Sequence, residues 1–60
     1  MRKQFVSVLN AFDYLFCFYL NGVDAEIGIS VDGAHDAERY IREHGTDADI
    51  AHMEYMMSVL

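Results

Sequence analysis

The sequence predicts an α+β fold, in which a small antiparallel sheet of two or three strands carries two C-terminal helices on one face. Three observations support this prediction. An Asn21-Gly22 pair stands between two apolar segments, as is typical of a β-hairpin. Pairing residues across that turn separates apolar from polar side chains. After residue 31, apolar residues recur at helical spacing. At 60 residues, the chain is expected to form a single compact domain over 1–60.

The hairpin is the sharpest local prediction. Both central positions of a two-residue type I′ turn need positive φ, which Asn and Gly adopt readily. Pairing outward from Leu20 and Val23 places an apolar set on one side of the sheet, namely Tyr14, Phe16, Phe18, Leu20, Val23, Ala25, Ile27 and Ile29. The opposite side then carries Leu15, Cys17 and Tyr19 on one strand, and Asp24, Glu26, Gly28 and Ser30 on the other.

The segment before the turn leaves a second interpretation open. We expect a first strand over 4–9 and a tight connection over 10–13. The same residues also fit a helical stripe that Gly22 would end. That stripe comprises Phe5, Val8, Leu9, Phe12, Leu15, Phe16, Tyr19 and Leu20. We favour strands, because aromatic and β-branched residues dominate and because other apolar residues, such as Cys17, would lie off the stripe.

Two helices are predicted in the C-terminal half. Asp32 can cap the first, Gly45 can provide its left-handed end, and Glu38 stands four residues before Arg42, which suits an exposed ion pair. The apolar face of this helix would comprise Ala34, Ala37, Ile41 and His44, with Tyr40 beside it. Thr46-x-x-Asp49 resembles a capping box for the second helix. Its buried stripe would comprise Ile50, Met53, Met56, Met57 and Leu60.

Charge is the most informative feature of the composition. Ten Asp and Glu residues stand against four Lys and Arg residues, which gives a formal net charge of −6 at pH 7. No Lys or Arg occurs between Asp13 and Glu38, and none follows Arg42. Such a surface repels nucleic acid and anionic membranes and attracts cationic partners. We therefore expect the partner to be a basic protein surface, with no direct binding to nucleic acid or membranes.

The predicted sheet suggests two interaction surfaces. Asp24 and Glu26 would project from one strand face, and Asp13 would extend the row, although a polar face kept for solubility has the same pattern. The full set of predicted acidic contacts is Asp13, Asp24, Glu26, Asp32, Asp36 and Glu38. Helix-dipole and capping effects also explain acidic residues near helix starts. The side left uncovered by the helices would form an apolar interface suited to a homodimer, made of Leu15, Cys17 and Tyr19.

Catalysis, metal binding and cofactors are not expected. His35, His44 and His52 lack the spacing of metal ligands. Cys17 is the single cysteine, so no disulfide can form within the chain. So short a chain leaves little room for a concave catalytic pocket. The lone cysteine, the lack of an evident export signal and the lack of a long apolar run predict a reducing, cytoplasmic setting.

In size, charge and absence of motifs, the chain looks like the short acidic proteins with which phages and mobile elements block host nucleic-acid machinery. Anti-CRISPR proteins and DNA mimics belong to this group. The resemblance covers no specific residues. It implies a non-catalytic inhibitor that occupies a cationic DNA- or RNA-binding surface of a host protein, within a bacterial cell if the chain is phage-encoded. The alternative is a small structural or regulatory homo-oligomer whose acidity serves only solubility.

Overall fold

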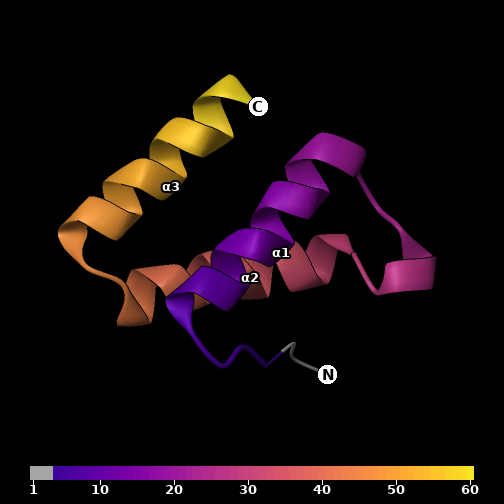
Figure 1. The fold of residues 1–60 in the computed structure, drawn as a ribbon, viewed down its shortest axis with the longest axis horizontal. Coiled ribbons are helices and arrows are strands. Elements are labelled where there is room, and N and C mark those ends of the chain that lie inside the picture. Colours follow the sequence, from indigo (N-terminus) through magenta and orange to yellow (C-terminus); the bar gives the residue numbers. More distant parts are fainter. Residues whose placement is uncertain (1–3) are drawn as a thin grey trace.

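The computed structural model describes residues 4–60, which form three α-helices (Figure 1). They are α1 (Val8–Asn21), α2 (Val31–His44) and α3 (Asp47–Val59), and a short 3-10 turn, η1 (Ala25–Ile27), lies between α1 and α2. The described residues contain no sheet, only one antiparallel bridge between Asp24 and Ile29. The predicted α+β fold is therefore wrong: the chain is a small helical bundle.

The predicted hairpin turn is the end of a helix. Asn21 is the last residue of α1, and Gly22 follows it at a φ of 74°, with its N–H donating to the Phe18 carbonyl. A type I′ turn and a helix C-terminus both favour glycine at positive φ, so the local pattern did not distinguish them. The strands predicted on either side of the turn, and the strand over 4–9, are wrong. The helical alternative for the first segment is confirmed from Val8 onward.

α1 begins at a serine cap and buries one narrow side. The Ser7 hydroxyl accepts a hydrogen bond from the Asn10 N–H at 3.1 Å. Ala11, Tyr14 and Leu15 are its buried residues, at the i, i+3 and i+4 spacing of one helical face. α2 packs much more extensively against α1 than against α3. An isolated hairpin would have left these side chains without such cover, and two-stranded hairpins are marginal on their own.

The prediction for α2 was right that the helix ends at Gly45, but wrong about its N-cap and about the conformation of Gly45. Ser30, rather than Asp32, is the N-cap, since its hydroxyl accepts from the Gly33 N–H at 3.1 Å. Gly45 follows the helix in an extended conformation (φ −83°), so the left-handed end is also wrong. His44 is exposed. Three residues of the predicted apolar face, Ala34, Ala37 and Ile41, are confirmed by their burial, whereas the placement of His44 on that face is wrong.

α3 begins with the predicted capping box, which is confirmed. The Thr46 hydroxyl accepts from the Asp49 N–H at 3.1 Å, and the Asp49 carboxylate accepts from the Thr46 N–H at 3.0 Å. Met53 and Met56 are buried. Of the other residues in the predicted stripe, Ile50 and Met57 are half-buried, whereas Leu60 is exposed.

The core takes one large, fully buried side chain from each helix. These residues are Leu15, Ile41 and Met53. α2 runs across the lower part of Figure 1, and α1 and α3 rise in the same general direction in that view. Burying one such side chain contributes about 1.5–3 kcal/mol, so each helix supplies a substantial part of a small core.

A tyrosine joins α1 to the start of α2. The Tyr14 hydroxyl donates to the Gly28 carbonyl and accepts from the Ser30 N–H, both at 2.9 Å. Gly33 is buried beneath this ring, where an added Cβ would overlap the Tyr14 hydroxyl. The missing side chain at Gly33 is what lets the tyrosine approach α2 so closely.

Candidate partner-binding surfaces

The acidic row predicted on a strand face does not exist. The Asp24 carboxylate caps η1 by accepting from the Glu26 N–H at 3.1 Å, and Glu26 lies within that turn. Asp32 stands nearby in the chain, in the first turn of α2. Glu26 and Asp32 are exposed, and Asp24 is half-buried. We call Asp24, Glu26 and Asp32 the acidic segment; it is a connection and a helix start instead of an extended strand.

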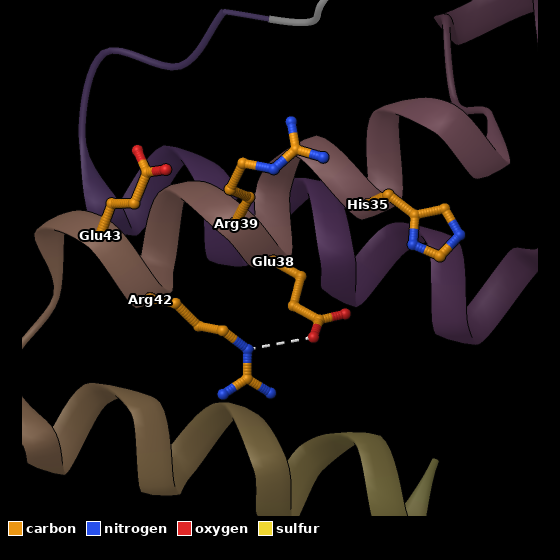
Figure 2. A pocket seen from close by; sticks show the side chains of 5 residues that line it. All are labelled: His35, Glu38, Arg39, Arg42 and Glu43. Atoms are coloured by element: carbon orange, nitrogen blue, oxygen red, sulfur yellow. Dashed lines mark hydrogen bonds and ion pairs between the residues drawn. The ribbon is translucent and has the colours of Figure 1, made fainter.

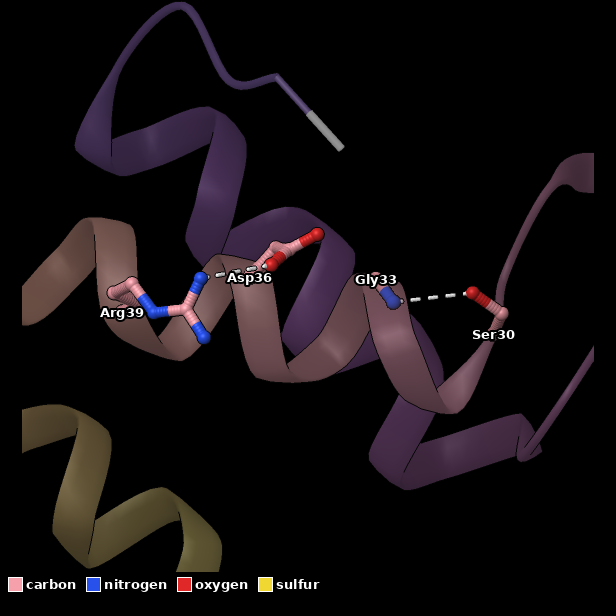
Figure 3. Close-up of polar contacts among 4 residues, drawn as sticks. All are labelled: Ser30, Gly33, Asp36 and Arg39. Carbon is pink, nitrogen blue, oxygen red and sulfur yellow. Dashed lines mark hydrogen bonds and ion pairs between the residues drawn. The ribbon is translucent and has the colours of Figure 1, made fainter. Parts of the chain in front are cut away.

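Two of the predicted acidic contacts are engaged within α2 itself. Arg42 Nε lies 3.1 Å from a Glu38 carboxylate oxygen (Figure 2), which confirms the predicted i, i+4 pair. Arg39 Nη1 lies 3.2 Å from Asp36 Oδ1 (Figure 3). These carboxylates neutralise both arginines of residues 4–60. The outward charge is therefore supplied by the other acidic residues.

A shallow hollow of about 390 Å³ lies along the same face of α2. It is lined by His35, Glu38, Arg39, Arg42 and Glu43 (Figure 2). All five side chains come from one helix, and no second element within residues 4–60 adds a polar group to the lining. We call this hollow the charged strip, because two arginines, two glutamates and a histidine line it.

The remaining predicted acidic residue lies elsewhere. Asp13 is exposed on α1, where it lines a groove toward α3. A further acidic group surrounds the connection from α2 to α3 and comprises Glu43, Asp47 and Asp49. The structure therefore distributes the carboxylates over all three helices and their connections. The six predicted contacts are divided between α1, the η1 turn and α2.

The predicted apolar interface depended on strand alternation, and the helix rearranges it. Leu15 is only 1% exposed and belongs to the core, while Cys17 and Tyr19 are half-buried. Other large apolar side chains are exposed instead, namely Val6, Leu9, Phe16, Leu20, Val23, Ile27, Val31, Tyr55, Val59 and Leu60. One signal could have indicated this surface: α1 has only three polar residues among 14, more apolar area than one packing face requires.

Part of this apolar surface forms a groove between α1 and α3, with a volume of about 270 Å³. We call it the α1–α3 groove; its lining residues are Leu9, Phe12, Asp13, Phe16, His52 and Met56. The rings of Phe12 and His52 meet edge to face with centroids 5.6 Å apart, and so connect the two walls. This groove was missed at the sequence level, because it depends on where α3 lies relative to α1.

The three histidines and the cysteine are distributed over all three helices. His35 belongs to α2 and lines the charged strip, His44 ends α2, and His52 belongs to α3. Cys17 is a free, half-buried thiol on α1. Within residues 4–60, no three His, Cys, Asp or Glu side chains are grouped as metal ligands would be. Over the same range, no helix combines the length and the apolar character needed to span a bilayer.

Comparison of the chain with protein-family models, curated proteins and solved structures gave no match.

Proposed function

We propose that this chain is a non-catalytic inhibitor that binds a cationic surface of another protein, of the kind that nucleic-acid-binding proteins use to hold phosphates. One observation supports the proposal most directly. Within residues 4–60, both arginines are paired with Asp36 and Glu38, and the other eight of the ten carboxylates have no arginine partner. A partner that approaches the acidic segment or the α2–α3 connection therefore meets carboxylates that no arginine offsets.

The distribution of this charge favours rapid, salt-sensitive association. The described residues span only 32 × 25 × 14 Å along the principal axes. At physiological ionic strength, exposed charges are screened over about 8 Å, so a partner responds mainly to the carboxylates at the contact itself. Electrostatic complementarity of this type accelerates association and weakens as salt is added. The proposal includes a reducing, cytoplasmic setting, which the single free Cys17 supports.

The test is displacement of labelled DNA or RNA from a panel of purified polymerases, helicases, nucleases and RNA-guided effector complexes. We expect the chain to displace nucleic acid from at least one of them, with an affinity that falls steeply between low and physiological salt. Glu26→Lys/Asp32→Lys should weaken displacement at least about tenfold, which corresponds to 1.4 kcal/mol. Both positions are exposed, so the fold should be retained.

A matched control reverses the same amount of charge at the other end of α2. Glu43→Lys/Asp47→Lys also changes two exposed carboxylates to ammonium groups. A smaller effect of this pair would identify the acidic segment as the contact, and a larger one would assign the contact to the α2–α3 connection. The proposed function would be rejected if displacement did not change with salt concentration or with either double substitution. It would also be rejected if the chain displaced nucleic acid from no member of the panel.

A second candidate function, a structural or regulatory homo-oligomer, is favoured by the ten large apolar side chains that are exposed within residues 4–60. Sedimentation equilibrium of the pure protein separates the two functions. A dimer at micromolar concentration without nucleic-acid displacement would support the oligomer. A monomer over the whole concentration range would eliminate it.

A further inference from the structure

We propose that the α1–α3 groove binds an amphipathic helix of a partner protein, in which Lys or Arg residues flank the apolar face. This inference rests on the proposed function, because it names the type of cationic element that the chain would recognise. It adds an apolar anchor to the charge attraction, and it assigns that anchor to one place on the molecule.

The α1 wall of the groove is an apolar row. Leu9, Phe12 and Phe16 line it at i, i+3 and i+7, and Leu20 continues the row by one further turn. Leu9 is 71% exposed, Phe16 48% and Leu20 54%. α2 packs against the Ala11/Tyr14/Leu15 side of α1, and nothing in residues 4–60 covers these outer side chains to the same degree. A contiguous apolar row of this kind marks an interaction surface.

The α3 wall presents a second, more adaptable row. His52 and Met56 line the groove at i and i+4, and Val59, which is 58% exposed, continues the row. Methionine is unbranched and polarisable, and it adjusts to side chains of different shape. The α1–α3 groove is thus bordered by a row of side chains from each of two helices. Such a groove is suited to bind the i, i+3/i+4 and i+7 side chains of a third helix.

The size of the groove also favours side chains over a small molecule. Its volume of about 270 Å³ lies below the roughly 300–1,000 Å³ of typical ligand pockets. Residues 4–7, the described part of the segment that precedes α1, do not line it. Phe5 contacts Tyr14 and Tyr40, with ring centroids 5.5 and 5.9 Å away, and is thereby held at the α1–α2 contact.

Charge selects a basic partner over a second copy of the chain. Asp13 lies within the groove lining, and two copies that pair through the groove would bring this carboxylate near its equivalent. Each copy would also bring a formal charge of −6 toward another −6. Repulsion of this sort opposes association, whereas Lys or Arg beside an apolar helix face would meet Asp13 favourably.

The experiment uses a synthetic helix of leucine and lysine with all leucines on one face, 14 residues long like α1. A peptide of the same composition with scrambled order cannot form that face. Because the chain has no tryptophan, one tryptophan in each peptide reports binding by fluorescence. We expect the amphipathic peptide to bind at least about tenfold more tightly than the scrambled one, the effect of about 1.4 kcal/mol of apolar contact.

Two pairs of variants locate the contact. Leu9→Ser should weaken binding of the amphipathic peptide about tenfold, whereas Ile27→Ser, which also alters an exposed aliphatic side chain, should leave it within about twofold. Asp13→Asn should weaken binding more than Asp47→Asn, which removes the same charge from outside the groove. Circular dichroism spectra that match the wild type show that each variant is folded.

The outcomes separate this inference from the proposed function. Equal binding of both peptides, or equal effects of Leu9→Ser and Ile27→Ser, would overturn the groove while leaving attraction to cationic surfaces intact. A dimer that Leu9→Ser dissociates, and that excludes the peptide, would overturn it in favour of a second copy. If the chain binds neither peptide, the groove inference is overturned as well. If the chain also displaces no nucleic acid from the enzyme panel, the proposed function is rejected too.

Discussion

Replacing Gly33 by alanine tests the packing on which the fold depends. The new Cβ would overlap the Tyr14 hydroxyl and crowd its ring, so the tyrosine must move. Movement gives up the two 2.9 Å hydrogen bonds to Gly28 and Ser30. At about 0.5–1.5 kcal/mol each, their loss costs about 2 kcal/mol, and overpacking of a tight site costs a further 1–3 kcal/mol or so.

An opposing term favours the variant. Alanine is about 1 kcal/mol better than glycine inside a helix, and Gly33 lies within α2. The balance is a loss of about 2–4 kcal/mol in the free energy of unfolding. For a domain of this size, each kcal/mol lowers the midpoint of thermal unfolding by about 4–8 °C, so the decrease should exceed roughly 8 °C.

The assay is urea and thermal unfolding followed by circular dichroism, with Tyr14→Phe as the second arm of a double-mutant cycle. Tyr14→Phe removes the atom nearest the new Cβ, although the ring remains close. Gly33→Ala should therefore cost about 1 kcal/mol less in the Tyr14→Phe background than in the wild type. A stabilised Gly33→Ala protein, with additive effects in the cycle, would show that helix propensity alone governs this position and would refute the close packing.

Three other substitutions test the remaining helix ends, the core and the ion pairs. Thr46→Ala removes the side chain that caps α3 and should lower the free energy of unfolding by about 1 kcal/mol in urea titrations. Met53→Ala leaves a cavity in the core and should lower the free energy of unfolding by about 2–5 kcal/mol. Met57 is only half-buried, so Met57→Ala should lower it clearly less. Equal losses of stability in the two variants would contradict the assigned core. Glu38→Gln breaks an exposed pair with Arg42 and should change stability by no more than about 1 kcal/mol, with the difference shrinking in high salt.

The C-terminal half was predictable because its signals are local. The Thr46 and Asp49 side chains bond to backbone groups three residues away, and Glu38 meets Arg42 one turn later. Helical spacing alone placed Ala37 and Ile41 on the buried face. The errors there concern helix ends, where Ser30 and Asp32 are both capable caps and the backbone selects between them.

The N-terminal half was mispredicted because its local signals agree with two structures. A glycine at positive φ, such as Gly22, is compatible with a hairpin turn and with the end of a helix. An almost entirely apolar segment also fits both the two-residue period of a strand and the 3.6-residue period of a helix. The contact of Tyr14 with the Gly28 to Gly33 region selects the helix, since it joins residues far apart in the chain. The same uncertainty affected the candidate site, because the acidic row and the Leu15-containing interface both assumed strands.

By itself, the sequence determined the excess of negative charge and the apolar content of the first segment. It also determined the capping box that begins α3 and the apolar residues on the buried side of α2. The tertiary structure alone decided that α1 is a helix, which carboxylates face a partner, and that α1 and α3 enclose a groove. The physical reason is distance along the chain. Caps and i, i+4 pairs form within one turn, whereas burial and grooves depend on helices brought together by long-range packing.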